Sequence, residues 1–323
     1  MKARRLFRAP SCPSWIILVF LFSVAHAAPG HDALIAMVKK PEPPVMTKRT
    51  IAPPTTQPAG EQIDLLDGDY KFRLFIPASY LAPADGKVDL CIHFHTAAWF
   101  AIDEHLRRGL NGPLLVAYFG EGSSTYGKPF ADRERFARVI ALTRGALSKA
   151  AGGKPIEIAN VDIASFSAGY GAVREILKDD KHIAIIRRIV LCDSLYAGWD
   201  PATTQPGATS RPAMENMQPF EKFVRLAAAG EKTFVLTHSS VPTPYANTAA
   251  TAKWVAELVD APRTDIAPSS NPASSDKDFP LLYRVDVGHL HLWGYGGEDA
   301  QAHLTHIRHL GDVWKALDAC GEP

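Results

Sequence analysis

Apolar residues along this chain gather in short runs separated by amphipathic or polar stretches. Tyr70–Pro77 alternates apolar and polar positions with a period of two and ends at a proline, which predicts an edge strand. The remaining runs are nearly continuous, as in strands buried on both faces of a sheet. They lie at Val88–Phe94, Leu114–Phe119, Ile156–Phe166, Ile185–Cys192, Thr233–Thr237 and Leu281–Val287.

Between these strand-like runs, apolar residues recur at helical spacing. One predicted helix directly follows the Ile156–Phe166 run. The others lie at Asp132–Lys149, Phe220–Ala229, Asn247–Val259 and Asp299–Leu317. Strands that alternate with helices predict an α/β fold, with a mostly parallel sheet flanked by helices on both faces in three layers. Leu281–Val287 is expected to be the last strand, and Asp299–Leu317 the closing helix.

The N-terminus has the composition of a secretory signal peptide. Lys2, Arg4 and Arg5 precede an apolar run over residues 15–24, and Ala25-His26-Ala27 matches a cleavage site. We therefore expect a signal peptide over residues 1–27 and export to the periplasm or beyond; an uncleaved anchor is the alternative. No later run approaches the roughly 18 apolar residues of a membrane helix, so no membrane span is expected after processing.

Composition divides the remaining chain in two. Residues 28–60 are rich in Pro, Thr and Lys, which predicts a linker or disordered tether, and residues 61–323 have the size of a single α/β domain.

The net charge is +1 and the chain has no basic stripe, so nucleic acid is not expected as a partner. Cys91 and Cys192 lie in apolar runs, as buried small hydrophobes do, and with Cys320 they leave room for one disulfide.

One strand-to-helix junction has the pattern of a catalytic turn. Ser167 directly follows the run ending at Phe166, with Ser165 two positions before it and Gly169 two positions after it. A strained turn between a strand and a helix leaves no room for bulk at those positions. The pattern predicts a nucleophile elbow with Ser167 at its tip. The alternative is a serine-rich loop that only caps the helix.

Other polar side chains follow predicted strands as Ser167 does. Asp193 comes after the strand ending at Cys192, and His289 and His291 come after the strand ending at Val287. Ligands of parallel sheets bind at the carboxyl ends of the strands. We therefore expect Ser167, Asp193 and the histidine pair to meet at one edge of the sheet.

From Tyr70 to Leu317 the chain resembles the α/β-hydrolase superfamily of esterase- and lipase-like serine hydrolases. The resemblance lies in the Ser165-Phe-Ser167-Ala-Gly169 elbow and in the chain order of serine, acid and histidine. A third element is His93-Phe-His95-Thr96-Ala97, which is similar to the oxyanion loop of the family. Thr96 replaces the glycine that usually stands in that loop.

The resemblance implies a serine hydrolase that works through an acyl-enzyme. A histidine would take the proton of Ser167, the serine oxygen would attack a carbonyl carbon, and water would release the acyl group. The backbone N–H groups of Ala168 and of the loop at Thr96 or Ala97 would form the oxyanion hole. No cofactor or metal is expected.

The acid is argued from an absence. No Asp or Glu occurs between Glu231 and Glu257, where the family often carries its acid. Asp193 is the nearest suitable carboxylate, with a turn cap as its alternative role. Asp286 is a weaker rival, because it lies within a predicted strand.

The base is assigned to His291, with His289 as its main alternative. Both lie in the Gly-rich segment after the predicted last strand, where the family has its histidine, and they share one side of an extended chain. His303, at the start of the closing helix, is a third candidate.

The expected substrate is a carboxylic ester, either a small molecule or one linked to a polysaccharide. Trp99, Tyr196, Trp199 and Trp293 lie near the proposed site segments and could line an apolar or sugar-stacking pocket, or could simply pack the ends of the sheet.

Two other classes of protein remain open. The pairs His93/His95 and His289/His291, with His303 and His306, could hold the metal of a metal-dependent hydrolase. That interpretation leaves the elbow unexplained. A non-catalytic binding protein on the same fold is the third class, because fold does not determine function.

Overall fold

The computed structural model describes residues 40–109, 111–203 and 210–322. The chain divides into two compact units, Met1–Val38 and Lys39–Pro323, and every described residue belongs to the second. The predicted signal peptide, residues 1–27, lies outside the described residues. In the described parts, no helix is both long and apolar enough to cross a membrane.

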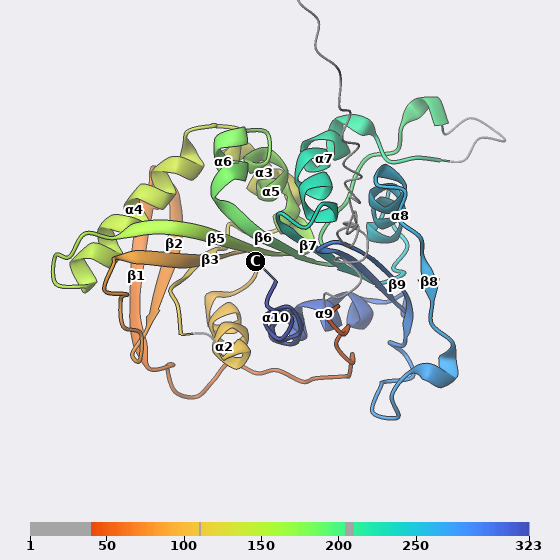
Figure 1. Ribbon diagram of the computed structural model, residues 1–323, viewed down its shortest axis with the longest axis horizontal. Helices are drawn as coiled ribbons and strands as arrows, with labels where there is room; N and C mark the ends of the chain where they lie inside the picture. The colour runs from red at the N-terminus through yellow and green to blue at the C-terminus, as the bar shows by residue number, and fades with distance from the viewer. Residues whose placement is uncertain (1–39, 110, 204–209, 323) are drawn as a thin grey trace, which may run out of the picture. The chain divides into compact units, whose positions relative to one another are not determined.

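A single ten-stranded sheet runs through the described domain in the order β1-β2-β4-β3-β5-β6-β7-β10-β9-β8 (Figure 1). Its central strands β4, β3, β5, β6, β7 and β10 are parallel, and antiparallel strands pair at each end. The strands are β1 Gly60–Asp67, β2 Tyr70–Pro77, β3 Lys87–Phe94, β4 Leu114–Ala117, β5 Glu157–Phe166, β6 Ile186–Cys192, β7 Thr233–His238, β8 Thr264–Asp265, β9 Leu281–Val287 and β10 Leu290–Tyr295.

Helices cover both faces of this sheet. Figure 1 shows α2, α9 and α10 on one face and α3 to α8 on the other. Their bounds are α2 Ala98–Arg108, α3 Ser123–Phe130, α4 Arg135–Ala150, α5 Tyr170–Ile176, α6 Asp180–Ile185, α7 Met214–Ala228, α8 Thr248–Leu258, α9 Ala300–Arg308 and α10 Leu310–Asp318. The predicted three-layer α/β architecture is therefore confirmed, and with its strand order the domain has the α/β-hydrolase fold.

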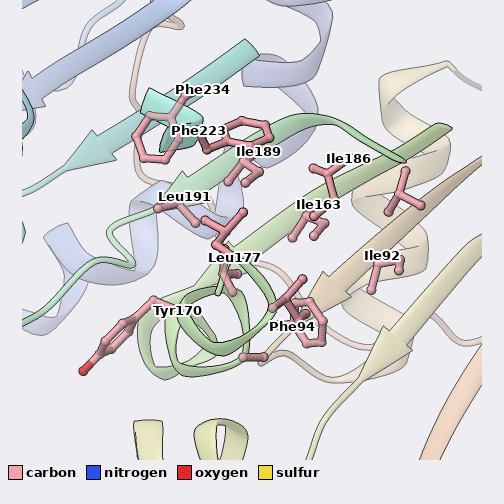
Figure 2. Packing of buried hydrophobic residues seen from close by; sticks show 14 of the residues in the cluster. Ile92, Phe94, Ile163, Tyr170, Leu177, Ile186, Ile189, Leu191, Phe223 and Phe234 are labelled. Atoms are coloured by element: carbon pink, nitrogen blue, oxygen red, sulfur yellow. The ribbon is translucent and has the colours of Figure 1, made fainter. Parts of the chain in front are cut away.

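Successive residues of the central strands face opposite layers, as the pleat of a strand requires. Ile189 and Leu191 of β6 pack with Ile163 and Phe234 under α5 and α7 (Figure 2). Val190, next to them in sequence, instead joins the cluster beneath α9 and α10. Because both faces are buried, these strands are apolar at nearly every position, which is why the sequence predicted them well.

The end of the sheet differs from the prediction. Leu281–Val287 is followed by a further strand, β10, and the two form an antiparallel hairpin in which Val287 pairs with Leu290. The two residues between them, Gly288 and His289, make the turn. Gly288 has a φ of 56°, and a Cβ there would lie 2.3 Å from the backbone oxygen of Ala228, so glycine is required. The predicted closing helix is also two helices, α9 and α10.

Part of the predicted linker is bound to the domain. Residues 41–49, here called the strap, are extended and contact β9, β10 and α9. Met46 is 1% exposed and belongs to the core cluster of α9 and α10. Tyr295 Oη donates to the backbone oxygen of Pro44 at 2.8 Å, and Arg284 Nη2 donates to that of Pro41 at 2.8 Å. Within the predicted linker, the strap is therefore packed on the domain, because its apolar residue Met46 and its backbone acceptors find partners there.

The cysteines of the described residues are all free thiols. Cys91 and Cys192 are buried in β3 and β6, as expected of small hydrophobes, and Cys320 is partly buried.

Two glycines offer a matched test of packing behind the elbow. A Cβ at Gly171 would lie 2.2 Å from the backbone oxygen of Ser123, whereas a Cβ at Gly145, on the exposed face of α4, would meet nothing within 4 Å. We expect Gly171→Ala to lower the free energy of unfolding by roughly 1–3 kcal/mol through overpacking. Gly145→Ala should raise it by roughly 0.5–1 kcal/mol through helix propensity. Urea denaturation of both variants measures this, and equal effects would contradict the contact between α3 and α5.

Candidate active site

Ser167 lies in a sharp turn between β5 and α5, as the elbow pattern predicts. Its φ is 47°, a left-handed conformation that is rare for a residue other than glycine and is typical of strained functional turns. Gly169 lets the turn pack closely, because a Cβ there would lie 2.6 Å from the backbone oxygen of Phe94 and 2.7 Å from Ser165 Oγ. The turn therefore needs glycine at that position.

Ser165 is more than a small residue in this turn. Its Oγ lies 2.6 Å from Ser194 Oγ, and Ser194 Oγ in turn donates to the backbone oxygen of Ser167 at 2.9 Å. Since Ser194 directly follows Asp193, the two hydroxyl groups connect the turn after β5 to the turn after β6. A glycine at position 165 could not make this connection.

Asp193 is fully buried at the end of β6, also with a left-handed φ, of 44°. Its carboxylate accepts hydrogen bonds from Ser239 Oγ at 2.6 Å, from Thr248 Oγ1, and from His303 Nδ1 at 2.8 Å. Burial alone would raise the pKa of Asp193, but the bond from His303, the nearby His306 and the bond from Ser239 hold it well below its usual value. The carboxylate is therefore a permanent negative charge behind His303.

His303 projects from the first turn of α9. Its ring stacks on Phe166, with centroids 4.5 Å apart and planes at 29°, and its side chain is 22% exposed. Because Asp193 occupies Nδ1, the outward nitrogen Nε2 is left to face the cavity beside Ser167. No hydrogen bond joins Nε2 to Ser167 Oγ within the described residues, and such bonds often tighten only when substrate binds.

A cavity of about 740 Å³ contains both Ser167 and His303. Its walls are the elbow, the loop between β4 and α3, the loop after β6 and the loop after β7. This volume lies in the usual range for small-molecule sites, roughly 300–1,000 Å³.

Backbone donors lie around the elbow where an oxyanion hole would form. Ala168, the residue after the serine, lines the cavity. His95, with a φ of 66°, turns the chain out of β3, and the loop Thr96–Ala97 then leads into α2. Within the described part of the chain, the N–H groups of Thr96 and Ala97 donate no hydrogen bond. Of the three predicted oxyanion-hole residues, only Ala168 borders the cavity; Thr96 and Ala97 follow the end of β3 that contacts Gly169.

The structure does not bring His291 or His289 to this site. His291 lies inside β10, fully buried, with Nδ1 2.6 Å from Asp286 Oδ1 and Nε2 2.8 Å from Glu322 Oε1. Burial opposes a charge on His291, but the two carboxylates outweigh it and raise its pKa, while His291 and Arg284 lower that of Asp286. His289 is in the β9–β10 turn, at the opposite edge of the sheet from the elbow. His291 thus lies within a buried strand rather than in the loop expected after β9, and Asp286 belongs to the same buried network.

The predicted aromatic pocket is only partly present. Tyr196 lines the cavity. Trp293 is buried in β10, and Trp99 packs against Phe100 at the start of α2, with centroids 5.5 Å apart; neither borders the cavity. These two residues pack the layer beneath the sheet, which was the alternative role considered for them.

The histidine pairs of the metal hypothesis are far apart. His93 lies on β3 and His291 on β10, with β5, β6 and β7 between them. Burial lowers the pKa of His93 to about 3, so it is a neutral core residue. The described residues contain no group of three or more His, Cys, Asp or Glu side chains placed to hold a metal ion.

Sequence reasoning missed Ser239 and Thr248, the hydroxyl donors to Asp193. Ser239 follows β7, the strand after which the family often has its acid, and Thr248 begins α8. One sequence feature could have pointed to them. No Asp or Glu occurs between Glu231 and Glu257, so the polar residues of this segment were candidates for binding an acid located elsewhere.

No family model matches this sequence, and no curated protein matches it. Solved structures do match its fold. A feruloyl esterase module from Clostridium thermocellum is 10% identical, with 86% of this chain and 95% of that chain covered and a TM-score of 0.46. A Pyrobaculum calidifontis esterase is 8% identical over 83% and 88%, with a TM-score of 0.47, and poly(aspartic acid) hydrolase-1 from Sphingomonas sp. KT-1 is 13% identical over 80% and 99%, with a TM-score of 0.44.

At these identities and TM-scores the similarity carries no argument about activity. The α/β-hydrolase fold of this chain follows from its own strand order and from the elbow after β5.

Proposed function

We propose that this protein is a serine hydrolase that cleaves carboxylic esters through an acyl-enzyme. Ser167 is the nucleophile, His303 the base and Asp193 the acid. One observation carries the proposal: a serine on a strained turn shares a cavity with a histidine whose inner nitrogen is bonded, at 2.8 Å, to a buried carboxylate. Serine, acid and histidine also follow one another in the chain order of the family.

Each residue has a defined step. His303 Nε2 takes the proton of Ser167 Oγ as the oxygen attacks the ester carbonyl carbon, and Asp193 stabilises the imidazolium and fixes its tautomer. The N–H groups of Ala168 and of the Thr96–Ala97 loop hold the developing oxyanion. His303 then gives its proton to the departing alcohol, and water releases the acyl group by the same steps.

We propose an ester rather than an amide as the substrate, because an alcohol is a better leaving group than an amine. The proposed substrate is an ester of a small molecule or an ester linked to a polysaccharide. We also propose that the protein is exported, and this part rests on the sequence of residues 1–27 alone.

The proposal is tested with a fluorophosphonate probe. The wild-type protein is expected to become covalently labelled at Ser167 and to hydrolyse phenyl acetate, with no effect of a chelator, whereas Ser167→Ala should do neither. A matched Ser165→Ala variant should still be labelled, because Ser165 Oγ is buried against Ser194. A folded wild-type protein that takes up no label would overturn the proposal, and loss of activity with chelator would favour a metal-dependent mechanism.

A further inference from the structure

Three tyrosines form a continuous row along one wall of the cavity. The ring centroids of Tyr170 and Tyr196 are 5.6 Å apart, and those of Tyr196 and Tyr245 are 5.7 Å apart. Exposure rises along the row, from 8% at Tyr170 to 46% at Tyr245. A row of phenol rings that opens toward solvent offers both a stacking surface and hydroxyl groups to a ring-shaped ligand.

Arg174 stands at the buried end of this row. It lies one helical turn after Tyr170 on α5, its guanidinium carbon is 5.7 Å from the centre of the Tyr170 ring, and its side chain is only 20% exposed. Arg174 also lines the cavity. Its position is therefore fixed by the same helix that begins at the elbow.

The guanidinium of Arg174 has unused hydrogen-bonding capacity. Its one charged neighbour within the described residues is Glu175, at 3.6 Å, and Glu175 is also bound by Lys178 at 2.6 Å. The 3.6 Å approach to Glu175 is longer than a hydrogen bond, and among the described residues no other acceptor is bonded to Arg174, although a guanidinium carries five N–H donors. A guanidinium that lines the cavity with its donors unused is placed to make charge-assisted hydrogen bonds to an anionic group of a ligand.

The acidic residue of the cavity does not cancel this charge. Glu121 lies at the loop before α3, its side chain is 82% exposed, and it accepts a hydrogen bond from Tyr118 Oη at 3.2 Å. Water and salt screen an exposed carboxylate strongly. On another wall, Asn216 uses Oδ1 to accept from Gly198 N at 2.8 Å, which leaves its amide hydrogens for a ligand.

We propose that the cavity selects esters of a ring compound that carries a negative charge, with the ring against the tyrosine row and the charge on Arg174. This proposal rests on the proposed function of Ser167. About two helical turns, roughly 10 Å, separate Arg174 from Ser167 along the chain. An occupant that reaches both residues must therefore carry the ester and the charged group on different sides of its ring. An aromatic acid and an acidic sugar share this chemistry.

The test compares matched esters. One pair is phenyl acetate and 4-carboxyphenyl acetate; the other is an acetylated methyl glucoside and the corresponding acetylated methyl glucuronide. In at least one pair, wild-type kcat/KM should be roughly tenfold or more higher for the charged member, as expected for a charge-assisted hydrogen bond. Arg174→Gln should bring that ratio close to one, and Arg144→Gln, on the exposed face of α4, should leave it unchanged. The pair that responds identifies the ring as aromatic or sugar.

A binding measurement separates failure of this proposal from failure of the proposed function. Calorimetry with 4-hydroxybenzoate and with methyl glucuronide should show binding of one of them to Ser167→Ala protein. Binding should be lost when Arg174→Gln is added and weakened by Tyr245→Ala. If Ser167 takes up the fluorophosphonate but neither anion is preferred or bound, the charge-selection proposal is wrong and the hydrolase proposal stands. If Ser167 is unreactive, anion binding that depends on Arg174 would still support the site.

Discussion

Replacement of His303 by glutamine is expected to lower kcat for phenyl acetate by about 10⁵ to 10⁶, the loss typical of removing the base of a serine hydrolase. Glutamine cannot accept the proton of Ser167, whereas the rest of the cavity stays in place. Labelling of Ser167 by the fluorophosphonate should slow in parallel. Steady-state kinetics at saturating ester, with circular dichroism as a check on folding, give the measurement.

His291→Gln is the matched control. His291 is buried between Asp286 and Glu322 and does not line the cavity. The kcat of the variant should therefore stay within a few-fold of the wild-type value. It should instead lose stability, by roughly 3–5 kcal/mol, because removing one partner leaves buried carboxylates uncompensated. A large loss of kcat in His291→Gln with normal activity in His303→Gln would reverse the assignment of the base.

Replacement of Asp193 by asparagine is expected to lower kcat by about 10⁴. The substitution keeps the shape of the side chain but removes the negative charge that stabilises the imidazolium. It also lets an amide N–H point at His303 Nδ1, which favours the wrong tautomer. Because the pKa of Asp193 is held far below its usual value, protonation of this group should not reduce kcat of the wild type in mildly acidic solution.

Asp286→Asn serves as the comparison for this variant, since Asp286 was the rival acid. It should lose stability through its contacts with His291 and Arg284 while retaining kcat. Equal losses of kcat in the two asparagine variants would argue against Asp193 as the acid.

The sequence was sufficient to predict candidate residues that lie directly after a buried strand. Ser167 and Asp193 each follow an apolar run, and each adopts the left-handed turn that such an exit from a parallel strand needs. The surrounding strands were predictable for the same reason, because burial on both faces makes them continuously apolar.

The proposed base, His303, could not be preferred over His291 from the sequence, because the choice depends on a strand boundary. Gly288-His289 is a two-residue turn, and Leu290–Tyr295 then forms β10. The end of β10, rather than that of β9, precedes His303. Histidine and tryptophan at strand spacing did not distinguish a buried strand from a site loop. The strap was missed for a related reason, because composition describes a segment but not the surface of the domain against which Met46 packs.

Because the proposed acid, Asp193, follows β6, the loop after β7 supplies no member of the proposed triad. That loop is fixed at both ends: Ser239 is bonded to Asp193, and Ala246 pairs with Ala197 across an isolated bridge. Val241 is tied to these anchors, because its N–H donates to Ser239 Oγ at 3.4 Å and its backbone oxygen accepts from Asn247 at 2.9 Å. In the segment that follows, residues 242–245, Thr243 and Tyr245 line the cavity. This short segment can therefore be exchanged as a cassette, so that new substrate preferences evolve, or are engineered, without rebuilding the apparatus that breaks the bond.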